Sequence, residues 1–359
     1  MIEIKVKQRI AYPKITKFFT PFFALFFALL FGAGLFKWVG VDPLKAYKIM
    51  LSGAFGNFYN FSEVIVRGIP LILSGLSVGL AAKMMLWNIG CEGQIVMGGV
   101  GATAIALFAS PYLPNYLVIP AMIFSGFIAG ALWIFIPAIF KAKWNVSEII
   151  STLMLNYIAI IWMEHLYFGP WRDPEGRGFP GSAIFPDAAW FPRYLGTRIH
   201  LGIFIVFIVT ILIYILLNFT KLGYEIKVIG ESELAARYAN IKVTRNIFIV
   251  LMISGGIAGL AGVGEVAGVY HRLQQGLSSG YGYAGIIVAW LGRLNPWGIL
   301  SVGIIFAGFM VGGDALQLNL QLPSSLSLVL EGALLFLVLA GEILPKYKIS
   351  ISWKKLSKS

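Results

Sequence analysis

A short stretch of polar side chains lies between two long apolar runs of this sequence. It reads LWNIGCEGQIVMGG, residues 86–99, and carries Asn88, Glu92 and Gln94 among glycines, which weaken a helix and free its backbone groups. Amides and carboxylates at membrane depth are costly unless they are paired or face a wet cavity. The stretch therefore predicts either a transporter's substrate site or hinge, or a short cytoplasmic turn in which Glu92 caps the next helix.

Further polar or aromatic side chains in apolar surroundings could bind the same kind of solute. Glu265 could line a pathway or hydrogen-bond a neighbouring helix, and Asn156 favours a helix–helix hydrogen bond. Tyr281 and Tyr283 could stack on a sugar or a base, or anchor the chain at the membrane interface. The predicted substrate pathway consists of Asn88, Glu92, Gln94, Asn156, Glu265, Tyr281, Tyr283 and Asp314.

Motifs for chemistry on a substrate are scarce. The chain has no phosphate-binding G-x-x-x-x-G-K-[ST] loop and no H-E-x-x-H zinc motif. Its three histidines are far apart in sequence, and its single cysteine, Cys91, excludes an intrachain disulfide and a thiolate metal cluster. We therefore predict that the chain is not an enzyme and has no catalytic residue, no metal site and no bound cofactor.

The composition of the chain indicates which kind of secondary structure must hold these polar residues in place. The 359 residues are 58% hydrophobic and 12% charged, with a mean hydropathy of +0.82, whereas soluble domains carry about 25% charged residues. Long apolar runs recur from end to end, sufficient to cross a hydrocarbon core of about 30 Å as helices, and they lack the alternation of barrel strands. The predicted fold class is all-α: a polytopic integral membrane helical bundle with about ten transmembrane helices.

Ten apolar segments are candidates for these spans. They cover residues 18–36, 64–86, 93–110, 117–140, 148–168, 201–218, 247–269, 282–292, 297–316 and 326–344. The eighth is too short to span upright and predicts a broken or re-entrant helix. In the seventh, small residues four positions apart, such as Gly255 and Gly259, predict close packing inside the bundle.

The distribution of Lys and Arg predicts the orientation in the cell membrane. With ten crossings, most of the 28 basic residues fall on the side of both termini, and the positive-inside rule makes that side the cytoplasm. The net charge of +12 is then mainly a topology signal rather than a nucleic-acid footprint. The predicted organisation is one transmembrane domain, residues 1–359, with a cytoplasmic N-terminus at 1–17, an extracellular loop at 169–200, a cytoplasmic segment at 219–246 and a cytoplasmic tail at 346–359.

The predicted extracellular loop is rich in proline and aromatic residues. Its Trp171, Trp190 and Phe191 suit a lid at the membrane interface or a docking surface for a partner.

The predicted cytoplasmic segment at 219–246 is of a different kind. Gly230 is expected to precede a short helix with Glu231 and Glu233 near its start and Arg237 near its end, which suits the helix dipole. A capped helix on this face predicts a contact for a partner; the alternative is an ordinary amphipathic linker.

Four separated blocks of the sequence are LWNIGCEGQIVMGG, NVSEIISTLMLNYIA (145–159), VIGESELAARYANIKV (228–243) and GYGYAGIIVAWLGRLNPWG (280–298). In this order and spacing they resemble the permease subunits of ABC importers for simple sugars and nucleosides, within the branched-chain amino acid and ribose-type permease family. With its extra N-terminal span, the chain is most similar to the longer of the two paired permeases in nucleoside-type systems.

This resemblance implies a permease that forms half of a transmembrane pore and moves a nucleoside or a simple sugar by alternating access. The implied partners are a cytoplasmic ABC ATPase, which binds the ATP, a second permease that is a paralogue or another copy, an extracellular substrate-binding lipoprotein and the lipid bilayer, with no nucleic acid. Residues 88–94 would lie on the pathway or at its gate. The implied coupling helix would contact the ATPase through Gly230, Glu231, Ala235, Ala236 and Arg237.

An alternative from another class is a stand-alone ion-coupled secondary transporter. In that case Glu92, Glu265, Asp314 and Glu331 would serve as proton or sodium sites within the membrane.

Overall fold

The computed structural model describes residues 2–8, 26–27, 29–176, 178–321 and 347–353, together with positions 329, 332, 333 and 336. Two short strands, β1 (Ile2–Gln8) and β2 (Tyr347–Trp353), pair antiparallel with Ile2 opposite Trp353. They lie within the segments predicted as cytoplasmic tails, and the sequence did not predict them. The remaining regular structure in the described residues is helical, which agrees with the predicted bundle.

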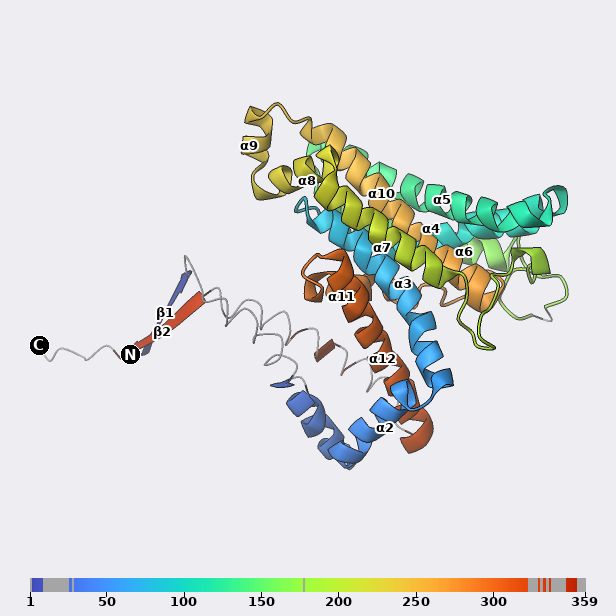
Figure 1. Cartoon of the computed structure of the whole chain (residues 1–359), viewed down its shortest axis with the longest axis horizontal. Helices are drawn as coiled ribbons and strands as arrows, with labels where there is room; N and C mark the ends of the chain where they lie inside the picture. Colours follow the sequence, from blue (N-terminus) through green and yellow to red (C-terminus); the bar gives the residue numbers. More distant parts are fainter. Residues whose placement is uncertain are drawn as a thin grey trace, which may run out of the picture. The chain divides into compact units, whose positions relative to one another are not determined.

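The helices follow one another along the chain with short connections (Figure 1). They are α2 (Pro43–Phe55), α3 (Phe58–Ala82), α4 (Cys91–Ala104), α5 (Asn115–Trp144), α6 (Glu148–Phe168), α7 (Gly202–Phe219), α8 (Lys221–Glu231), α9 (Glu233–Tyr238), α10 (Val243–Gly264), α11 (Tyr281–Leu291) and α12 (Pro296–Leu320). Helix α4 continues through the π-helical turn η1 (Ile105–Ala109) and the 3-10 turn η2 (Ser110–Tyr112), and α10 through the π-helical turn η4 (Glu265–Tyr270). A further 3-10 turn, η3 (Asp187–Ala189), lies in the long loop.

Within the described residues, seven helices are long and apolar enough to cross a membrane. They correspond to the second to seventh and the ninth predicted spans, and α11 corresponds to the short eighth. The first predicted span, 18–36, is described only in part, and the tenth, 326–344, lies almost wholly outside the described residues. The chain is therefore a multi-pass helical membrane protein, and the total of ten spans stays a prediction.

Two compact units make up the chain. The first comprises residues 1–56 and 309–359, and its buried cluster of Phe36, Ala46, Met50 and Leu316 packs α2 against the last turns of α12. The second, residues 57–308, holds α3 to α11 and all the other helix packing discussed below.

Helix α10 lies at the centre of the second unit, between α4 and α5. A methyl group added at Gly255 would meet the carbonyl oxygen of Gly130, and one added at Gly259 would meet that of Gly126. Gly98 of α4 would be equally crowded by Gly259. The predicted close packing of small residues on α10 is confirmed, because only glycine lets these backbones approach so closely.

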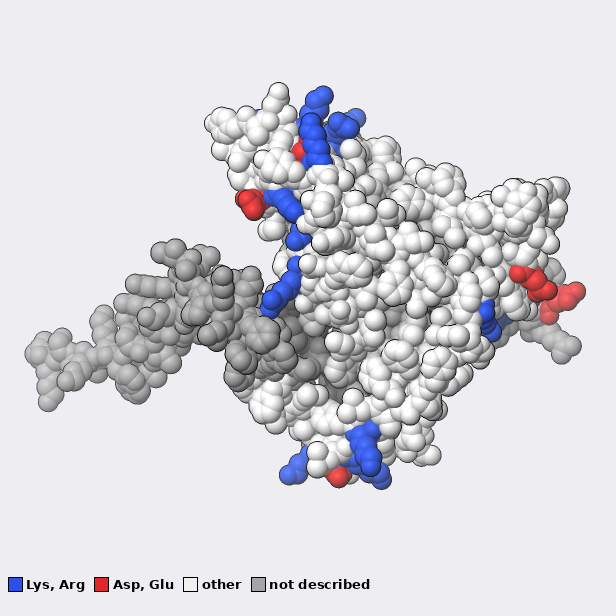
Figure 2. All heavy atoms as spheres, viewed as in Figure 1, with Lys and Arg blue, Asp and Glu red and all other residues white. Residues whose placement is uncertain are grey.

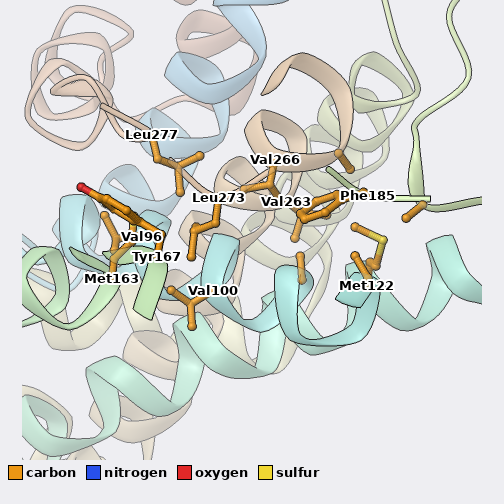
Figure 3. Close-up of a cluster of buried hydrophobic side chains, with 14 of the residues drawn as sticks. Val96, Val100, Met122, Met163, Tyr167, Phe185, Val263, Val266, Leu273 and Leu277 are labelled. Atoms are coloured by element: carbon orange, nitrogen blue, oxygen red, sulfur yellow. The ribbon is translucent and has the colours of Figure 1, made fainter. Parts of the chain in front are cut away.

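A cluster of buried apolar side chains fills the space between α4, α5, α6 and the long loop (Figure 3). Val96 of α4 lies beside Met163 and Tyr167 of α6, and Phe185 of the loop lies beside Val263 of α10. This cluster fixes the helices that carry most of the predicted polar site.

The two ends of the second unit carry different elements (Figures 1 and 2). One end carries α8 and α9, over which Lys and Arg gather, and the other carries the loop of residues 169–200. Helix α7 connects the two ends. The segments predicted to lie on opposite sides of the membrane are thus at opposite ends of the unit; which end faces the cytoplasm stays a prediction.

Candidate functional site

The linker before α4 folds back into the bundle. Cys91, the first residue of α4, places its Sγ atom 3.9 Å from the carbonyl oxygen of Ser74 and from the hydroxyl of Ser77, well inside α3. Asn88 of the linker is buried. Residues 83–90 thus form a short turn between α3 and α4, as the alternative predicted, and Asn88 of this turn is buried between the helices. That it faces the cytoplasm stays a prediction.

Helix α11 also begins inside the bundle. Its 11 residues extend about 17 Å at 1.5 Å per residue, roughly half of a 30 Å hydrocarbon core. Gly285 packs against Ser74 near the middle of α3, and Trp290 stacks on Trp87 with ring centroids 5.4 Å apart. The short eighth segment is thus a broken helix surrounded by protein, as predicted.

Glu92 joins the starts of these two helices. Its carboxylate accepts hydrogen bonds from the backbone N–H groups of Gly280, at 2.9 Å, and Gly282, at 2.7 Å, and the hydroxyl of Ser278 adds another. The side chain is only 4% exposed. A carboxylate at a helix N-terminus is stabilised by the orphan N–H groups and the dipole. Glu92 was predicted as a possible cap of the helix that follows it; the helix it caps is α11 instead.

Asn88 and Gln94 form a closed amide pair beside Glu92. The Nδ2 atom of Asn88 donates to Oε1 of Gln94 at 2.9 Å, and Nε2 of Gln94 donates to Oδ1 of Asn88 at 2.8 Å. Asn88 also donates to the hydroxyl of Ser254 on α10, which bonds the carbonyl oxygen of Ser77 on α3. The pair therefore ties α3, α4 and α10 together, and the two serines are members of the site that sequence analysis missed.

Asn156 of α6 makes the helix–helix bonds expected of it. Its Oδ1 atom accepts from the N–H of Gly93 at 2.8 Å, and its Nδ2 atom donates to the carbonyl oxygen of Ile89 at 2.9 Å and to the hydroxyl of Tyr283 at 3.3 Å. Tyr281, the first residue of α11, is buried, whereas Tyr283 is 40% exposed. Tyr283 is accordingly the member of this group whose ring can reach a solute.

Six of the eight predicted pathway residues thus come together in one polar hub, which we define as Asn88, Glu92, Gln94, Asn156, Tyr281 and Tyr283. Glu265 lies elsewhere in the second unit, in η4 at the end that carries the 169–200 loop. Asp314 lies partly buried on α12 within the first unit, and Glu331 lies outside the described residues. In the part of the chain that is described, no three His, Cys, Asp or Glu side chains converge in a way that could hold a metal ion.

Glu148 is a further residue near the hub that the sequence did not single out. It accepts from the backbone N–H of Trp87 at 3.2 Å and pairs with Lys141 at 3.0 Å, although it is mostly buried. It therefore anchors the re-entrant linker to the turn between α5 and α6.

The predicted partner contact consists of two helices rather than one. Gly230 and Glu231 belong to the last turn of α8, and the prediction that Gly230 precedes the short helix and Glu231 starts it is wrong. The break falls at Ser232, whose hydroxyl accepts from the N–H of Ala235 at 3.2 Å and caps α9. Gly230 packs on the carbonyl oxygen of Lys83, which fixes α8 to the end of α3.

Helix α9 presents an exposed apolar and charged face. Arg237 pairs with Glu233 at 2.6 Å, one helical turn away, and Ala236 is buried beneath it. Leu234 is 67% exposed and Tyr238 is 86% exposed. Exposed large apolar residues on a short, capped helix are a signature of an interaction surface, and neither was identified from the sequence.

The 169–200 loop is clamped onto the opposite end. Phe191 is buried and bonds the carbonyl oxygen of Ala267 through its N–H at 2.9 Å, and Trp190 stacks on His271 at 4.0 Å between ring centroids. Arg193 lies 2.9 Å from Nε2 of His271. Burial lowers the pKa of His200, next to this clamp, to about 4, and the positive charge of Arg193 adds to the shift.

A bundle of membrane-length helices, with two helices starting inside it at a polar hub, defines the membrane subunit of a transport system. The family model described as branched-chain amino acid transport system, permease component, matches residues 60–339. The chain belongs to this family, and the resemblance in the four sequence blocks is confirmed.

Individual relatives agree with this assignment. The glucose ABC transporter permease protein of Haloferax volcanii is 31% identical, covering 99% of this chain and 95% of the relative. The guanosine ABC transporter permease protein of Bacillus subtilis is 31% identical over 79% of this chain and 82% of the relative. The nucleoside ABC transporter permease protein of Lactococcus lactis subsp. cremoris is 30% identical over 93% and 95%. None of these names supports the ion-coupled alternative.

Proposed function

We propose that this chain is a permease subunit of an ATP-driven importer that moves a nucleoside or a simple sugar across the cell membrane by alternating access. The relatives named for glucose, guanosine and nucleosides support this substrate class. The chain supplies the path, and a separate ATPase binds the ATP. Chemistry on the substrate, a resident metal and a cofactor form no part of this function.

The observation that carries the proposal is the exposed helix α9. Its Leu234 and Tyr238 project from a helix whose start is capped by Ser232 and whose base, α8, is fixed to α3 at Gly230. A partner that grips α9 would therefore move a rigid element rather than a loose loop. We assign this face to a cytoplasmic ABC ATPase, with Gly230, Glu231, Ala235, Ala236 and Arg237 among or beneath the contact residues.

The polar hub suits the transmission of that movement. Glu92, Asn88 and Asn156 connect α4 to α11, α10 and α6 through hydrogen bonds between 2.7 and 2.9 Å. Because α8 contacts Lys83 at the end of α3 and the hub bonds begin a few residues further along the chain, a shift at α8 can reach the starts of α4 and α11 through packed protein. In this proposal the exposed ring of Tyr283 borders the solute path.

The remaining partners follow from the same proposal. A second permease, either a paralogue or another copy, completes the pore, and a substrate-binding lipoprotein docks on the end that carries the 169–200 loop. Both termini are then cytoplasmic, on the side of α8 and α9.

Replacing Leu234 and Tyr238 together with alanine tests the assignment of α9. The full chain is co-expressed with its ATPase and purified from membranes, and the retained ATPase is measured. We expect at least a tenfold loss, because exposed aromatic and apolar anchors dominate such interfaces, while the chain still inserts. The control is Tyr116→Ala, at an equally exposed position on the first turn of α5. Undiminished ATPase retention in the double variant contradicts the assignment.

A further inference from the structure

The more open side of α11 carries two aromatic rings. Elsewhere the helix is tightly packed, and neither Gly282 nor Gly285 leaves room for a methyl group. Tyr283 is exposed, and Ile286 and Trp290 are half-buried. Because these three residues are spaced three and four positions apart, they lie along one side of the helix. Broken helices at membrane depth are tolerated where they border protein or a water-filled cavity, so this open side suits the wall of a solute path.

A pair of stacked indoles lies two turns beyond Tyr283. Asn156 of the hub donates to the hydroxyl of Tyr283 at 3.3 Å, and Trp290 follows about 10 Å further along the helix. There Trp290 stacks on Trp87 of the linker, with ring centroids 5.4 Å apart and 26° between the ring planes. The open side of α11 therefore connects the polar hub to a second aromatic position.

The linker that carries Trp87 is in contact with α8. Its first residue, Lys83, has its carbonyl oxygen against Gly230 of α8, and the backbone N–H of Trp87 donates to Glu148 at 3.2 Å. The Trp87 residue is 38% exposed, so its ring has open space into which it can move. A movement of α8 that shifts the linker would therefore uncover the face of Trp290.

The indole N–H of Trp290 needs an acceptor that the described residues do not supply. Its Nε1 atom is buried and has no hydrogen-bond partner among them. An indole nitrogen can only donate, and a buried donor without an acceptor is costly. A group that satisfies it must bring an acceptor atom to the edge of the same indole whose face Trp87 covers.

We propose that Trp290 is an inner stacking site for the solute, between the polar hub and α8. A solute ring with an apolar face takes the place of Trp87 on the indole, and an oxygen at the edge of that ring accepts the hydrogen bond from Nε1. The base of a nucleoside and the ring of a sugar both have this chemistry. The inference rests on the proposed function and adds to it a position at which the solute is held on its way past the hub.

The first test compares the two indoles in membrane vesicles that contain the assembled importer. Initial rates of uptake of labelled guanosine and labelled glucose are divided by the amount of assembled importer. For the transported solute, Trp290→Leu should lower the rate about tenfold, the contribution of one stacked ring. Trp290→Phe should lower the rate less, because it keeps a ring and loses only the N–H donor.

Trp87→Leu is the matched control, because it breaks the same stack but leaves the ring on which the solute binds. It should lose far less of the uptake rate than Trp290→Leu. Equal losses in the two variants would show that the indoles only pack on one another and would overturn the proposal. An undiminished rate in Trp290→Leu would overturn it too.

The second test detects the solute without relying on transport. Because Cys91 is the only cysteine, a Cys91→Ala background permits Ile286→Cys, one turn before Trp290, to be labelled selectively with a small hydrophilic thiol reagent. We expect labelling in the assembled importer that slows when the transported solute is present, and loss of this protection when Trp290→Leu is added. Tyr116→Cys, at an exposed position on the first turn of α5, should react equally with and without solute.

Failure of the stacking site and failure of the proposed function have different signatures. If the unaltered importer takes up no nucleoside or sugar, the proposed function fails. If uptake is normal but Ile286→Cys is not labelled, is not protected by the solute, or stays protected with Trp290→Leu, only the stacking site fails.

Discussion

The carboxylate of Glu92 accepts a 2.7 Å hydrogen bond from the backbone N–H of Gly282, 190 residues further along the chain. The bond attaches the start of α11 to the first turn of α4 inside the bundle. The buried carboxylate and the buried N–H group each have the other as hydrogen-bond partner. The acid in the apolar sequence is therefore a connection between the starts of α4 and α11.

Removing this connection should destabilise the bundle. Glu92→Ala leaves the N–H groups of Gly280 and Gly282 without their acceptor, and at about 1–3 kcal/mol for each buried donor the loss is about 2–6 kcal/mol. Glu92→Gln keeps one acceptor oxygen and should lose less. Thermal unfolding in detergent measures both, and the exposed Glu231→Ala serves as the control. Equal melting temperatures for Glu92→Ala and the unaltered chain would contradict the capping role.

Close packing on α10 gives a second prediction. Gly259→Ala places a methyl group against the carbonyl oxygen of Gly126, and overpacking of this kind costs about 1–3 kcal/mol. Gly34→Ala meets nothing within 4 Å and should be neutral or stabilising by up to about 1 kcal/mol, because alanine favours helix. Gly259→Ala should lower the melting temperature, whereas Gly34→Ala should leave it unchanged or raise it. A shift for Gly259→Ala no larger than that for Gly34→Ala would show that the helices have room to separate.

His200, which lies beside the contacts that hold the 169–200 loop, should make the stability of the chain depend on pH. The pKa of His200 is lowered from 6.5 to about 4 in the folded chain, so the unfolded chain binds the proton first as the pH falls. Stability is then fully present above pH 6.5 and is lost between pH 6.5 and about 4, by about 3 kcal/mol for this residue. His200→Asn, whose side-chain oxygen can replace Nδ1 as acceptor for the N–H of Gly202, should lose less stability over that interval. Replacing the exposed His165 provides the comparison, and an unchanged pH dependence in His200→Asn would exclude His200 as the cause.

Hydropathy and length predicted the spans, because a helix in lipid must be apolar along its whole length. The same reasoning found α11, which is too short to cross. What it missed are partnerships between distant residues: nothing near Glu92 indicates Gly282, and nothing near Asn88 indicates Ser254. These contacts depend on how the helices pack against one another, and the residues next to Glu92 or Asn88 in the sequence do not determine that packing.

Two local features were available in the sequence and were overlooked. Ser232 before Glu233 is a favourable helix start, and it marks the break between α8 and α9 that was expected two residues earlier. Asp42 followed by Pro43 is likewise a strong helix start, and it begins α2, where the Asp42 side chain accepts from the N–H of Leu44 at 3.0 Å.

Transport in a defined system tests the central claim most directly. The chain is reconstituted in liposomes with its ATPase, its second permease and its binding protein, and uptake of labelled guanosine and glucose is followed. We predict uptake that requires ATP on the side of α8 and α9, stops with an ATPase unable to hydrolyse it, and persists when ion gradients are collapsed. Uptake by this chain alone, driven by a proton or sodium gradient without ATP, would contradict the account.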